Sequence, residues 1–231
     1  MITLEKEVQM SERYRIGLIL AVVGGFLDVH TYVCRGKVFA NVQTGNIVLF
    51  GISLIEKKWW SAFEYFMPIT AFVLGVLIAE FVREKCNKEN FHWRQGILLL
   101  EIATLLGVSF IPIGKYDIIA NVLVSFVCSL QADTFKKFRG NVYASTMCTG
   151  NLRSTSEFLY KFMRDKKRDT FRKSNLYFGI IISFISGGMI SAELTKIFLE
   201  KAVLFGVMGL IVVFFMLFVD YEKKIGDKNV L

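Results

Sequence analysis

The tripeptide Thr-Gly-Asn occurs twice in apolar surroundings, at residues 44–46 and 149–151. Its hydroxyl and amide groups could hydrogen-bond and orient a polar solute. A helix starting at the motif would also present partly positive backbone N–H groups to an anion. A plainer role is also open, in which small and amide residues pack two broken helices together. The candidate binding residues are Asn41, Gln43, Thr44, Gly45, Asn46, Gln131, Thr149, Gly150 and Asn151.

Two ionisable residues lie toward the outer end of the first long apolar run, Asp28 and His30. Ionisable side chains inside a membrane span are costly and commonly functional. Asp28 is therefore a candidate proton or cation site. The alternative is a carboxylate at the membrane interface that pairs with His30 or Arg35.

Further charged residues lie in the second half of the chain. Asp133 is close in sequence to Lys136, which favours an ion pair at the interface over ion coupling. Arg153, just beyond the second tripeptide, could attract an anion or be neutralised by Glu157 four residues later. Glu101 lies near the beginning of an apolar run, where we expect a solvated carboxylate.

Neither a metal site nor an enzyme is indicated. The four cysteines (Cys34, Cys86, Cys128 and Cys148) form no CxxC pair and have no histidine at ligand spacing, so we expect no metal and no cofactor. The sequence also lacks a recognisable nucleophile–base pair and an HExxH motif. A membrane-embedded enzyme acting on lipid-like substrates remains an alternative, as does a scaffold or sensor that transports nothing.

Composition places these residues in a membrane protein. Hydrophobic residues make up 54% of the chain, and the 21% that are charged gather in short blocks. The blocks separate apolar runs of about 18–22 residues, long enough to cross a hydrocarbon core of about 30 Å. The net charge of +8 comes from Lys and Arg in loops, which favours contact with lipid headgroups over nucleic acid. The runs are 16–34, 38–55, 61–82, 96–114, 118–135, 142–160, 175–194 and 202–219.

The runs 38–55 and 142–160 differ from the rest because polar residues fill the first half of one and recur along the other. We expect each to enter the membrane as irregular chain and return as a half-helix. In the first, Thr44 would be the N-cap and Gly45 would permit a close backbone approach. Six membrane spans then remain, with 20 Lys and Arg on the cytoplasmic side and 7 outside, against 16 and 11 for eight spans. The positive-inside rule favours six spans, with both termini in the cytoplasm.

The polar segments belong to an internal repeat. Residues 36–46 align with 140–151, 25–28 with 129–132, and 75–80 with 188–193. We therefore expect one all-α membrane domain over 1–231, made of repeat one (13–114), repeat two (115–220) and a cytoplasmic tail (221–231). With three spans in each repeat, the second would insert upside down and give an inverted repeat. Eight spans would instead give two parallel units.

Nearly the whole chain resembles the YoaK-like bacterial membrane proteins, known as domain of unknown function 1275. The resemblance lies in Gly25-Phe-Leu-Asp28, Val38-Phe-Ala, Thr44-Gly45-Asn46, Leu130-Gln131 and Thr149-Gly150. It implies a multi-pass membrane protein of a family often described as small-molecule transporters, with no established substrate. The chain departs from the family where Ser129-Leu-Gln-Ala-Asp replaces the commoner Gly-Leu-Gln-Asn-Ala, so one polar side chain is lost or displaced to Asp133.

Together these features predict a transporter or channel for a small polar or anionic solute in the plasma or inner membrane. The solute would bind near the membrane midplane, between the two repeats. Expected partners are membrane lipid and the solute, and small-residue helix faces would also suit a homodimer.

Overall fold

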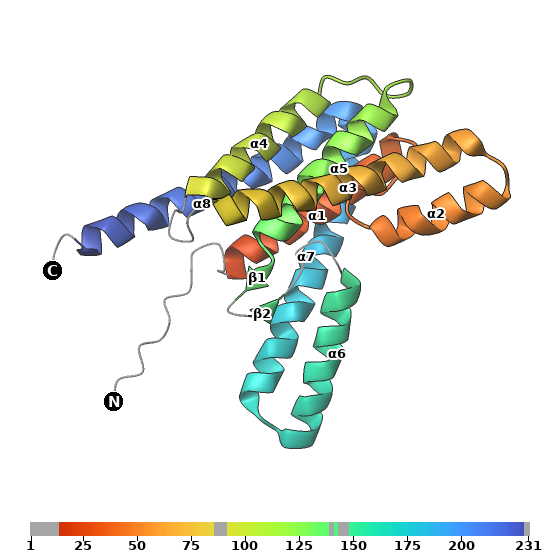
Figure 1. Cartoon of the computed structure of the whole chain (residues 1–231). Coiled ribbons are helices and arrows are strands. Elements are labelled where there is room, and N and C mark those ends of the chain that lie inside the picture. Colours follow the sequence, from red (N-terminus) through yellow and green to blue (C-terminus); the bar gives the residue numbers. More distant parts are fainter. Residues whose placement is uncertain (1–13, 86–91, 139–140, 143–147, 229–231) are drawn as a thin grey trace.

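A computed structural model describes residues 14–85, 92–138, 141–142 and 148–228. Helices form nearly all of this structure, and the one β element is a pair of two-residue antiparallel strands (Figure 1). The elements are α1 (Tyr14–Cys34), α2 (Gln43–Ile55), α3 (Trp59–Lys85), α4 (His92–Val108), α5 (Asp117–Thr134), β1 (Lys137–Phe138), β2 (Asn141–Val142), α6 (Cys148–Asp165), α7 (Arg168–Phe198), the 3-10 helix η2 (Leu199–Ala202) and α8 (Val203–Lys228).

Four stretches of the described chain are long and apolar enough to cross a membrane: Tyr14–Cys34, Trp59–Lys85, Asp117–Thr134 and Arg168–Leu217. The last has 50 residues, which would be about 75 Å of continuous helix. Leu199 interrupts it with a left-handed φ of 50°. Figure 1 shows α7 and α8 running in different directions on either side of this break. α7 and α8 are therefore separate helices.

The two halves of the chain have the same pattern of neighbours. α1 packs against α7, and its counterpart α5 packs against α3. α2 forms a hairpin with α3, as α6 does with α7, and both hairpins project from the body of the molecule (Figure 1). α4 contacts α5, α8 contacts α1, and α4 contacts α8. If α1, α2, α3 and α4 are exchanged with α5, α6, α7 and α8 in that order, the contacts named here map onto one another.

Glycines allow the closest helix contacts in the fold. A Cβ on Gly25 would fall on the backbone carbonyl of Phe184, and one on Gly187 would fall on that of Val22. α1 and α7 therefore meet backbone to backbone, as small residues permit in membrane bundles. In the other half, a Cβ on Gly75 would meet the Ser129 side chain of α5.

α1 and α5 run antiparallel. Near one end of the pair, the Asn121 side chain donates to the Arg35 carbonyl at 2.7 Å. Near the other end, the Gln131 side chain donates to the Leu20 carbonyl at 3.1 Å. The sequence numbers thus rise along one helix as they fall along the other.

Several element boundaries differ from the sequence-based expectation. α4 begins at His92 rather than 96, and α7 begins at Arg168 rather than 175. α6 is a full 18-residue helix whose exposed residues include Arg153 and Glu157, whereas we expected a half-helix. Because α7 is about 46 Å long, its polar first turns reach beyond a hydrocarbon core of about 30 Å. α6 pairs with that polar end.

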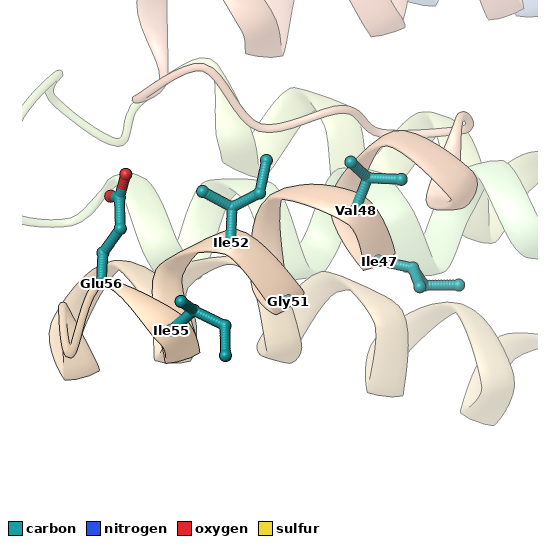
Figure 2. A pocket seen from close by; sticks show the side chains of 6 residues that line it. All are labelled: Ile47, Val48, Gly51, Ile52, Ile55 and Glu56. Carbon is teal, nitrogen blue, oxygen red and sulfur yellow. The ribbon is translucent and has the colours of Figure 1, made fainter.

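The outer face of α2 is apolar. Ile47, Val48, Ile52 and Ile55 surround a shallow groove at Gly51, with Glu56 at one end (Figure 2). These side chains are exposed, and the groove offers a polar solute little to bind. Such a surface suits contact with lipid tails, and the polar groups of interest lie elsewhere.

Candidate functional site

The chain after α1 turns back and runs beside the helix it has just left. Gly36 and Lys37 have φ values of 80° and 64°, which reverse the chain. The Asn41 amide then donates to the Gly24 carbonyl, at the middle of α1, at 3.1 Å. The irregular segment therefore extends about halfway along α1, and α2 begins there. This geometry matches the return path expected for the first polar segment.

Asn46 fastens this irregular segment in place. Its side-chain oxygen accepts a hydrogen bond from the Phe39 N–H at 3.0 Å. Its amide donates to the Phe39 carbonyl at 2.8 Å and to Gln43 Oε1 at 2.9 Å. The Gln43 amide donates to the Ala40 carbonyl at 2.8 Å. Both amides are thus engaged within the segment, which favours a packing role for these two candidate residues.

Thr44 is not the N-cap that the sequence indicates. The capping position is Val42, which makes no side-chain capping bond, and Thr44 is exposed. The backbone itself supplies acceptors: the Gln43 N–H donates to the Asn41 carbonyl at 2.8 Å and the Gly45 N–H to the Val42 carbonyl at 2.9 Å. The expected close approach at Gly45 is present, since a Cβ there would lie 2.7 Å from the Phe39 ring.

The second motif opens α6. Asn151 is buried, whereas Thr149 and Gly150 are exposed. Cys148, just before them, is close enough to Asp28 for the charge of that carboxyl to act on its thiol. The start of α6 therefore lies near the same part of α1 as the first motif. Residues 143–147 of the second copy lie outside the described residues.

Asp28 is the most deeply buried of the candidate carboxyl groups that the sequence singled out. It is 3% exposed, and its Oδ1 accepts from the Asn41 N–H at 2.7 Å and the Val42 N–H at 3.3 Å. Its Oδ2 has no hydrogen-bond partner among the described residues. The carboxyl thus caps the irregular segment with one oxygen and leaves the other unused.

The expected pairing of Asp28 with His30 or Arg35 is wrong. Residues two apart on a helix point in different directions, and His30 Nδ1 lies 3.3 Å from Thr195 Oγ1 on α7. Arg35 lies farther along α1 and bonds Asp117 Oδ1 at 3.0 Å.

Arg35 has no exposed surface, and both of its terminal nitrogens are engaged, whereas its Nε has no partner among the described residues. Besides Asp117, its guanidinium donates to the carbonyls of Pro112 at 3.1 Å and Ile111 at 2.7 Å. It therefore fastens the end of α1 to the chain between α4 and α5, across the boundary between the halves. A charge used in this way is not available to a solute.

Three polar side chains follow one face of α1. Gln131 and Asn41 donate to the carbonyls of Leu20 and Gly24, one helical turn apart, and Asp28 lies one turn further on. Each leaves one buried oxygen without a partner among the described residues: Gln131 Oε1, Asn41 Oδ1 and Asp28 Oδ2. The sequence identified all three residues but not their alignment.

α5 contributes two further groups to this region. The Cys128 thiol lies close to the Asn41 side chain, and the buried Ser125 hydroxyl, one turn earlier, has no partner among the described residues. We call these five residues, Asp28, Asn41, Ser125, Cys128 and Gln131, the α1–α5 seam. All are at most 3% exposed, so the seam is closed in this conformation.

Asp133 and Arg153 lie outside the seam. Asp133 pairs with Lys136 at 3.0 Å, as the sequence predicts. Arg153 is exposed on α6, so it forms no deep anion site. Glu157 bonds Lys161 at 2.6 Å, and this ammonium lowers the pKa of the carboxyl, with a smaller lowering from the charge of Arg153. Lys161 is therefore the hydrogen-bonding partner of Glu157, and Arg153 acts on the carboxyl electrostatically. A glutamate four residues before a lysine is the favoured order on a helix.

Glu101 is the functional candidate that the sequence interpretation missed. It lies in the middle of α4, is 0% exposed, and neither carboxyl oxygen has a partner among the described residues. The expected solvated carboxylate is therefore wrong. The spacing of Glu101 could have indicated its burial, since it lies on one helical stripe with the apolar residues Leu98, Leu105 and Val108. All four are buried in the structure.

Known proteins place the chain in a family. The model of a family described as "Protein of unknown function (DUF1275)" matches residues 16–216. The chain is 28% identical over 186 residues to the UPF0700 transmembrane protein YoaK of Bacillus subtilis (strain 168), covering 75% of this chain and 80% of that protein. No solved structure matches. The chain is thus a membrane protein that belongs to the DUF1275 family, as its sequence motifs indicate.

Proposed function

We propose that this protein is a transporter or channel that moves a small polar solute through the α1–α5 seam. The observation that carries the proposal is the set of three aligned, buried and unused oxygens on Gln131, Asn41 and Asp28. A buried polar group without a hydrogen bond costs about 1–3 kcal/mol. We therefore infer that a ligand or water donates hydrogen bonds to these three oxygens at some stage of the transport cycle.

The chemistry of the seam favours a solute that donates hydrogen bonds. The unused groups include carboxyl and amide oxygens, which accept from amines, ammonium groups and hydroxyls. The nearby cation Arg35 is already engaged by Asp117 and two carbonyls. At the start of α2, the N–H groups of Gln43 and Gly45 are likewise occupied by backbone carbonyls. A cationic or hydroxylated solute therefore fits better than the anion that helix N-termini alone would suggest.

The proposed architecture is an inverted repeat of six spans, α1, α3, α4, α5, α7 and α8, with both termini in the cytoplasm of the producing cell. Support comes from the antiparallel course of α1 and α5 and from the equivalent neighbours of the two halves. The distribution of 20 cationic residues inside and 7 outside also favours it. The seam then lies where the two repeats meet, as in many secondary transporters.

A closed seam can pass a solute only if helices move. The close contacts of α1 with α7 and of α3 with α5 suit two rigid pairs that rock against one another. Opening between the pairs would expose the seam to one side and then the other. Lipid remains the proposed surrounding partner.

A ligand-stabilisation screen tests the proposal. The purified protein in detergent is heated with small amines, polyols and, as a contrast, inorganic anions. We expect a subset of amines or polyols to stabilise the wild type, by about 2.7 kcal/mol at a concentration 100 times Kd. Asp28→Asn should lose this stabilisation, whereas the control Glu193→Gln, on an exposed side chain of α7, should keep it. Stabilisation only by anions, or stabilisation unaffected by Asp28→Asn, would place any site outside the seam.

A further inference from the structure

Glu101 stands apart from the other buried carboxyl groups because nothing near it compensates its charge. Asp28 accepts two backbone hydrogen bonds, whereas both oxygens of Glu101 lack any partner among the described residues. Its neighbours on the same stripe of α4, Leu98 and Leu105, are also 0% exposed. The carboxyl is therefore held in the interior of the protein with no link to solvent in this conformation.

The groups that face Glu101 come from the helices around α4. α5 brings the Cys128 thiol, and both Glu101 and Asp28 of α1 are close enough to act on that thiol electrostatically. Residues 203–217 of α8 include no titratable residue. Ala79 of α3 shares a buried cluster with Trp93 and Ile97 of α4 and Leu130 of α5.

The charges of α3 near that contact are engaged with one another and with the end of α5. Glu80 pairs with Arg83 and with Lys136, and Asp133 pairs with both of these cations. The other titratable groups near Glu101 are thus a thiol and a second carboxyl, and neither can neutralise it.

An ionised carboxylate in such surroundings is very costly, so the group holds a proton instead. The protonated form is also incomplete here, because its O–H has no acceptor among the described residues. Water would stabilise both protonation states, by solvating the charge of the ionised form and by accepting a hydrogen bond from the O–H of the protonated form. Of the two, only the ionised form depends on water for its stability, so opening of the surrounding helices and loss of the proton should occur together.

We propose that Glu101 is a proton-binding site that is loaded in this closed conformation and releases its proton to water when α4 and α5 separate. Asp28, whose charge also acts on the Cys128 thiol, is the carboxyl to which such water would connect it. The proton site stands whether or not a solute passes through the seam, whereas its coupling to solute movement rests on the proposed function. Among the described residues no three His, Cys, Asp or Glu side chains gather in a metal-binding group, which favours a proton over a metal ion.

Infrared difference spectroscopy of the protein in lipid vesicles tests this site. The wild type should show a carbonyl band of a protonated carboxyl that is lost in Glu101→Gln and kept in Glu193→Gln. The band should disappear reversibly as the pH of the medium is raised, because the proton is then released. It should shift in heavy water, which shows that the proton exchanges. Glu101→Asp should retain a titrating band at a changed frequency, which assigns the band if the glutamine variant folds poorly.

Three results would overturn the proposal. A band that neither titrates nor shifts in heavy water would make Glu101 a permanently neutral packing residue. Absence of the band at every pH would mean that the carboxyl is ionised. A band that disappears only when Na⁺ or K⁺ is added would make the site a cation site. None of these results depends on finding a solute, so a failed ligand screen and a failed proton site remain distinguishable.

Discussion

Gly25→Ala destabilises the folded protein by about 3 kcal/mol, the upper part of the range for overpacking. The added methyl group would fall on the Phe184 backbone carbonyl of α7. A backbone carbonyl in a helix cannot change rotamer as a side chain can, so α1 and α7 must move apart. Because α1 also carries Asp28 and the carbonyls that hold Gln131 and Asn41, we expect the seam to be disturbed as well.

Gly51→Ala is the matched control for this substitution. Gly51 lies within α2, and nothing stands within 4 Å of its Cβ position. The same methyl group should there be neutral or stabilise the protein by up to about 1 kcal/mol through helix propensity. Both variants are compared with the wild type by thermal unfolding in detergent. Equal stability of the two variants would mean that α1 and α7 do not meet at these glycines.

Cysteines at positions 58 and 161 should be labelled from opposite sides of the membrane. Lys58 lies in the turn between α2 and α3, and Lys161 lies on α6, and both side chains are exposed. The proposed six-span arrangement places α3, α4 and α5 between them, an odd number of crossings. Labelling should therefore be all-or-none for an impermeant thiol reagent added to intact cells, with position 58 outside and position 161 inside.

The labelling is done in a background without the four native cysteines, each replaced by serine. Disruption of the membrane should make position 161 reactive, which shows that its cysteine is intact. If both positions react from the same side, an even number of crossings separates them. The repeats would then be parallel, and the seam would no longer lie between inverted halves.

Much of the helical framework could be predicted from hydropathy and glycine patterns. The apolar runs correspond to helices α1, α3, α4, α5, α7 and α8, although the ends differ by several residues. Gly25 and Gly187 lie where α1 and α7 meet backbone to backbone, a contact that small residues favour between membrane helices. The polar start of the run 38–55 correctly indicated an irregular return beside α1. These features depend on local composition, which a single sequence contains.

The errors concern partners that are distant in sequence. Arg35 finds Asp117 and two carbonyls more than 70 residues away, which no local spacing reveals. Thr44 is a good capping residue, but backbone carbonyls already satisfy the first turn of α2. Glu101 was misplaced because we took the apolar run to begin at residue 96, whereas α4 begins at His92. That earlier start moves Glu101 from the end of a helix to its middle.

The accessibility of Cys128 tests most directly whether the α1–α5 seam opens as a solute pathway. Cys128 is 0% exposed in the closed conformation, so reaction with a small, impermeant methanethiosulfonate reagent reports opening. In a variant that retains only this cysteine, reconstituted in vesicles, we predict slow modification in the native state, and slower modification with a stabilising amine or polyol. Modification that occurs only after the protein is unfolded in detergent would show that the seam stays closed, and would contradict a transport pathway through it.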